Sequence, residues 1–107
     1  MLKSLRFFTV KLLLLFSLGV FAAGQLDINE IKSAAEEGDA LAQAKMGAIY
    51  HLGKGVMQDR KEAARWMINA ADQGLIEAMV VVAAMYDVGL GVDRDPDVST
   101  AWYKSRS

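Results

Sequence analysis

Residues 50–66 read YHLGKGVMQDRKEAARW, and residues 86–102 read YDVGLGVDRDPDVSTAW. The two stretches share a tyrosine, a Gly-x-Gly-Val turn, an aspartate and a final tryptophan, in the same order and 36 residues apart. The same offset joins Ala34, Ala35 and Gly38 to Ala70, Ala71 and Gly74. A fixed offset that aligns helix-filling and helix-ending residues indicates an internal duplication of a helical unit.

Signals for helix starts and helix ends recur in each unit. Gly38 and Gly74 follow alanine-rich segments, where a left-handed residue commonly ends a helix. Asp59 and Asp95 are placed as N-terminal caps, and Pro96 follows at the first helical position, where its missing N–H costs nothing. These signals predict helices over 27–37, 40–52, 60–73, 76–88 and 96–105.

The predicted fold is all-α: a short right-handed α-solenoid made of antiparallel helix pairs. The turns at 53–56 and 89–92 connect the two helices of each pair, because two glycines flanking one residue permit a tight reversal. Aromatic side chains are expected to supply most of the buried area, namely Tyr50, Trp66, Tyr86 and Trp102.

The first 24 residues have the features of a cleavable signal peptide. Three basic residues lie within positions 1–11, and an apolar run follows over 12–23. That run is shorter than the roughly 20 residues that a membrane-spanning helix needs. Small residues suit cleavage after Ala22 or Gly24. This pattern predicts a bacterial periplasmic or secreted protein without a stable membrane anchor. The alternative reading is a buried or interfacial N-terminal helix.

Charge and cysteine content exclude two kinds of protein. Without the basic residues of positions 1–11 the chain keeps nine basic and 13 acidic residues, a formal charge of −4. Nucleic-acid binders need clustered Lys and Arg to displace phosphate counterions, so a nucleic-acid partner is not expected. The sequence contains no cysteine, so disulfides cannot stabilise an exported product.

The duplicated unit resembles the Sel1-like repeat family, relatives of the tetratricopeptide repeats. Residues 34–69 form a first repeat and carry nearly the whole family pattern: Ala34, Ala35, Gly38, Ala42, Met46, Gly47, Tyr50, Gly53, Gly55, Val56, Asp59, Ala63 and Trp66. Residues 70–107 form a second repeat and depart from the pattern at Val82 and Ala83, where the family prefers Leu-Gly. The resemblance implies two full 36-residue repeats, with residues 25–33 as an N-terminal capping half-repeat.

The resemblance implies a scaffold or adaptor that binds a protein partner along a helical groove, without a cofactor. An alternative is a periplasmic inhibitor or immunity-type protein that neutralises a secreted effector. Catalysis is the third class, and the sequence offers no nucleophile and base that would support it. Because two repeats form a small core, the chain is expected either to self-associate through its last helix around Trp102 or to be stabilised by its partner.

Helical periodicity predicts a partner-binding face. At 100° per residue, Ala42, Met46, Ile49 and Tyr50 share the core side of one helix. The residues expected to contact a partner or a second copy of the chain lie on the opposite side of this helix and of its repeat equivalent: Lys45, Leu52, Val80, Val81 and Val88. The alternative, that neighbouring helices or the tail of the chain cover this stripe, stays open.

Metal and catalytic sites are not predicted. His51 is the only histidine, and with no cysteine it is expected to be a surface residue near a helix end. The acids of residues 93–97 lack the glycine and the final glutamate of a calcium-binding loop. Glu36, Glu37 and Asp39 are sequence neighbours that point in different directions, so they are expected to form a solvated helix end.

Overall fold

The computed structural model describes residues 27–106, so the predicted signal peptide and its cleavage sites after Ala22 or Gly24 lie outside the described residues. Within the described range the chain forms helices and no strand. The helices are α2 (Ile28–Glu36), α3 (Ala40–Leu52), α4 (Arg60–Asp72), α5 (Ile76–Val88) and α6 (Pro96–Ser105). Each lies within one residue of its predicted bounds at both ends, so the all-α prediction is confirmed.

Aspartate side chains start four of these helices. Asp59 accepts the backbone N–H of Glu62 at 3.1 Å, and Asp95 accepts that of Val98 at 3.2 Å, as predicted. Asp39, expected to be part of a solvated helix end, instead accepts the N–H of Ala42 at 2.9 Å and caps α3. Each bond satisfies an amide that the first helical turn leaves without an intrahelical partner.

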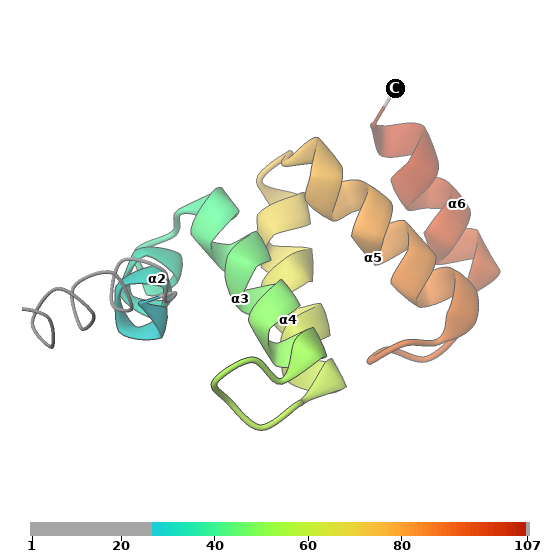
Figure 1. Ribbon diagram of the computed structural model, residues 1–107. Coiled ribbons are helices and arrows are strands. Elements are labelled where there is room, and N and C mark those ends of the chain that lie inside the picture. Colours follow the sequence, from blue (N-terminus) through green and yellow to red (C-terminus); the bar gives the residue numbers. More distant parts are fainter. Residues whose placement is uncertain (1–26, 107) are drawn as a thin grey trace, which may run out of the picture.

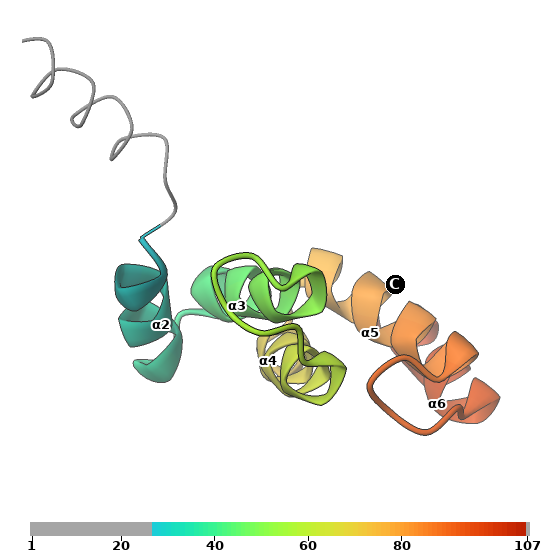
Figure 2. The same cartoon turned by 60° about the horizontal axis from the view of Figure 1, so that its bottom comes forward.

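Consecutive helices pack antiparallel, and the pairs stack side by side (Figure 1). Figure 2 shows α3 and α5 in one layer with α4 and α6 in the layer beneath them. The contacts run from α2 to α3, α3 to α4, α4 to α5 and α5 to α6, so each helix is held by its sequence neighbours. This nearest-neighbour order is that of a helical solenoid.

Alanine and methionine fill the core, contrary to the expectation that aromatic residues would. Trp66 is 5% exposed, whereas Tyr50, Tyr86 and Trp102 are only half-buried at the edges of the two core clusters. The largest fully buried side chains are Met46 and Val82. Small buried alanines allow helix axes to approach closely, which leaves little room for large rings between them.

Close backbone contacts fix the stacking of the second helix pair on the first. Gly91, in the loop between α5 and α6, has φ +73, and a Cβ there would lie 2.1 Å from the backbone oxygen of Arg60 in α4. Its repeat equivalent Gly55 lies against the Ile28 side chain of α2, with 2.6 Å between such a Cβ and the Cδ1 at the flexible end of Ile28. The loop of each pair therefore rests on the helix that precedes the pair.

We expect Gly91→Ala to destabilise the protein more than Gly74→Ala. Both glycines have positive φ, but nothing lies within 4 Å of a Cβ at Gly74. Gly74→Ala should cost only the left-handed penalty of about 1–2 kcal/mol. Gly91→Ala should cost about 1–3 kcal/mol more, because the α4 backbone must move. Urea unfolding followed by circular dichroism measures both, and equal losses would contradict the proposed stacking contact.

Candidate functional site

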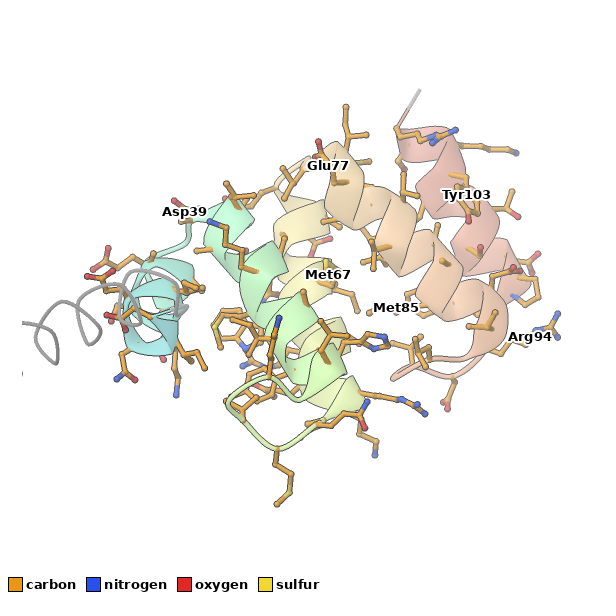
Figure 3. All side chains as sticks on the ribbon, viewed as in Figure 1. Asp39, Met67, Glu77, Met85, Arg94 and Tyr103 are labelled. Atoms are coloured by element: carbon orange, nitrogen blue, oxygen red, sulfur yellow. The ribbon has the colours of Figure 1, made fainter. Side chains whose placement is uncertain are left out.

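A groove of about 340 Å³ opens between α3 and α5, the first helices of the two stacked pairs. Helices α3, α4 and α5 and the loop after α5 supply its lining: Ala48, His51, Met67, Val81, Ala84, Met85, Val88 and Leu90. Figure 3 shows Met67 and Met85 in the space between α3 and α5. The two methionines form the floor of the groove. Met67 comes from α4, which lies under α3, and Met85 is a buried residue of α5.

Two of the predicted partner-binding residues line this groove. Val81 and Val88 are 38% and 66% exposed and stand one above the other on α5, seven residues apart. Leu52, at the end of α3, is as exposed as Val88, but it does not line the groove. Val80 is half-buried and Lys45 lines a different hollow, so the structure does not bring all five residues together.

His51 departs from the expected surface position, because its ring is half-buried and lines the groove. Its Nδ1 is buried, and no described residue offers it a hydrogen-bond partner. The backbone carbonyl of His51 accepts a hydrogen bond from the Gln58 amide at 2.7 Å. The imidazole is therefore the single polar side chain in an otherwise apolar groove.

A second hollow, of about 230 Å³, lies between α2 and α3. Its lining combines apolar and charged side chains: Glu30, Ile31, Ala34, Asp39, Leu41, Ala42 and Lys45. The shape of this hollow depends on the position of α2 against α3. The buried side-chain amide of Gln43 helps to hold α2 in that position. Gln43 donates to the backbone oxygen of Ala35 at 3.1 Å and accepts from the Gln73 amide at 2.8 Å. Gln43 thus links α2, α3 and the end of α4.

The strongest charge interaction lies elsewhere, on α4. The Arg65 guanidinium hydrogen-bonds the Glu62 carboxylate, which lowers the pKa of Glu62 and raises the pKa of Arg65. Arg65 also stacks over the Trp66 ring, 4.6 Å from its centroid. Neither charged residue lines the groove, so they do not set its chemistry.

The outward positions of α6 are polar. Thr100, Tyr103 and Arg106 are exposed there, at the repeat positions where α4 carries Ala64, Met67 and Ala70. Arg106 lies over the Tyr103 ring at 6.0 Å. The predicted self-association around Trp102 stays a prediction.

The described residues hold no group of three or more acidic or histidine side chains placed to bind a metal ion. Helices α2 to α6 are also too short and too polar for any of them to cross a bilayer.

A family model described as Sel1 repeat matches residues 40–75 and 76–105. The matched segments start with α3 and α5, again 36 residues apart and six residues after the predicted repeat starts. No curated protein matches the chain.

Two solved structures resemble the chain. A Sel1 repeat protein from Oxalobacter formigenes superimposes with a TM-score of 0.71 at 32% identity, covering 74% of this chain and 60% of that one. A protective antigen of uropathogenic Escherichia coli with the SLR fold gives a TM-score of 0.72 at 33% identity, covering 77% and 18%. The chain thus spans less than two thirds of the length of either protein.

We expect Gln43→Ala to loosen α2 selectively. The substitution removes a buried hydrogen-bond partner, which typically costs about 1–3 kcal/mol. Hydrogen–deuterium exchange should accelerate at the amides of α2 and stay unchanged in α5 and α6. Gln58→Ala is the matched control, because Gln58 also donates to a backbone carbonyl but is exposed. Equal acceleration of α2 exchange in both variants would contradict the assigned role of Gln43.

Proposed function

The chain belongs to the Sel1 repeat family, and from this premise we propose that it is an exported interaction module that binds a protein partner in the groove between α3 and α5. Sel1 repeats generally mediate protein–protein interactions, and the fold is typically a non-enzymatic scaffold. The groove lies on the first helices of the repeats, which face the binding surface of helical repeat arrays.

The observation that carries this proposal is the exposure of apolar side chains at the groove. Val81 and Val88 remain open to water, and they adjoin the exposed small residues Ala48 and Ala84. Apolar surface gathered in one concavity commonly marks an interaction site, because burying it against a partner is favourable. Methionines at the floor can adapt to the shape of the bound side chain.

The chemistry of the groove supports the binding of apolar side chains. A hydrolytic or transfer site needs a nucleophile and a base within hydrogen-bond reach of each other. The lining instead offers aliphatic and thioether side chains around the one imidazole of His51. Such a surface recognises a partner mainly by desolvating its apolar side chains.

Export is supported by the sequence alone. The basic start, the apolar run over 12–23 and the small residues around Ala22 and Gly24 match the pattern that signal peptidase recognises. We place the chain in the periplasm or outside the cell on this basis. There it acts as an adaptor, and capture of a secreted toxin as its dominant partner would instead favour the inhibitor role.

Export predicts a processed N-terminus. When the full coding sequence is expressed in a Gram-negative host, the periplasmic fraction should contain a chain beginning at Ala23 or Gln25. Peptide mass spectrometry of its first residues checks this. An N-terminus that retains residues 1–22 in the cytoplasmic fraction would contradict export.

Groove binding predicts a position-specific crosslink. A photoreactive benzoylphenylalanine at Val88 should form an adduct with the partner in the source cells, and the same residue at Ile76 should not. Val88 and Ile76 lie on the same helix and are similarly exposed, at 66% and 55%, but only Val88 lines the groove. Adducts are resolved by gel shift and identified by mass spectrometry.

Introducing Val81→Lys into the Val88 crosslinking variant should abolish the adduct, because a buried charge without a partner opposes docking. Circular dichroism must show that this double variant is folded. Two results would argue against the groove as the binding site. One is an equally strong adduct when the photoreactive residue replaces Ile76, and the other is an adduct at position 88 that persists in the presence of Val81→Lys.

A further inference from the structure

The two hollows on either side of α3 are neighbours. Lys45 lines the hollow beside α2, and Ala48 lines the groove beside α5. Residues three apart on a helix are adjacent on its surface. Because Lys45 and Ala48 are both exposed, only a low ridge of α3 separates the hollows. A single bound segment can therefore run from one hollow across α3 into the other.

The two ends of this track differ in chemistry. The groove end is apolar, with Val81 and Val88 beside the methionines of its floor. The α2 end presents the carboxylates of Glu30 and Asp39, and Lys45 is its one basic side chain. Glu77 adds a further acid on the Val81 side of α5, one turn before it (Figure 3).

These acids are available to a partner. The described residues contain one ion pair, that between Arg65 and Glu62, so Glu30 and Glu77 are not neutralised by a neighbouring cation there. The Oδ1 of Asp39 accepts the N–H of Ala42 at 2.9 Å. Residues 27–106 also carry a formal charge of −4, which favours the approach of a basic segment.

We propose that the partner presents an extended segment with Lys or Arg at one end and large apolar side chains at the other. This inference rests on the proposed function and names the chemistry of its ligand. The apolar end enters the groove at Val81 and Val88, and the basic end lies against Glu30 and Asp39. Since α3 has 13 residues, the track is roughly 20 Å long, which about six extended residues span.

A contact of groove against groove about a two-fold axis does not fit this track, because it would bring two concave surfaces together and they cannot fill each other. It would also bring Glu30, Asp39 and Glu77 of both copies onto one interface, where like charges repel.

The test uses a displayed library of random nine-residue peptides, selected on the purified protein. We expect the selected peptides to carry Lys or Arg near one end and Leu, Ile, Phe or Met near the other. Fluorescence anisotropy then gives the affinity of one selected peptide for three charge variants. Glu30→Lys should weaken binding about fivefold, Lys45→Glu should strengthen it to a similar degree, and Glu36→Lys should leave it unchanged.

Glu36 is the matched control because it is exposed on the same helix but does not line the hollow. Selected peptides without a basic end, or equal effects of Glu30→Lys and Glu36→Lys, would overturn the inferred ligand chemistry while leaving groove binding intact. Val88→Lys separates the two claims, since peptides that bind this folded variant as well as wild type would overturn groove binding itself. Concentration-dependent dimerisation that Val88→Lys removes would overturn the inference in favour of a second copy.

Discussion

The contact between the Gly91 loop and the α4 backbone at Arg60 determines where the second helix pair sits on the first. A side chain at Gly91 would overlap the Arg60 carbonyl, so the loop can lie there only because the residue is glycine. The equivalent loop, at Gly55, lies against the Ile28 side chain of α2. The groove lies between α3 and α5, the first helices of the two pairs that the Gly91 contact brings together.

The composition of the core explains why that space stays open. Buried alanines allow α3 to pack closely on α4, and a Cβ at Gly47 would lie 3.1 Å from the backbone oxygen of Ala63 in α4. Met67, also on α4, lines the groove. A larger side chain at Ala48 or Ala84 would fill the groove, but both positions are small and exposed. The stability of the stack and the openness of its binding surface therefore have the same origin, which is the use of small residues where helices meet.

Local signals in the sequence predicted the helices and one side of the site, while contacts between distant residues determined the rest. Asp59, Asp95 and the alternation of Ala42, Met46 and Ile49 act within one helical turn or along one helix, so the sequence alone revealed them. His51 shares the groove with Leu90 and Met67, which come from a later loop and another helix. The Gln43 network joins residues 30 positions apart and has no periodic signature. Asp39 could have been recognised as a cap, because it directly precedes the alanine-rich start of α3.

The methionines provide the most direct test of the groove as the binding site. Met67 and Met85 line it, Met46 and Met79 are buried in the core, and Met57 is 90% exposed in a distant loop. Methyl carbon-13 spectra of methionine-labelled protein, recorded with and without the partner identified by crosslinking, report on all five positions at once. Shifts confined to Met67 and Met85 are the expected result. Shifts centred on Met57, with the two groove methyls unchanged, would contradict the account.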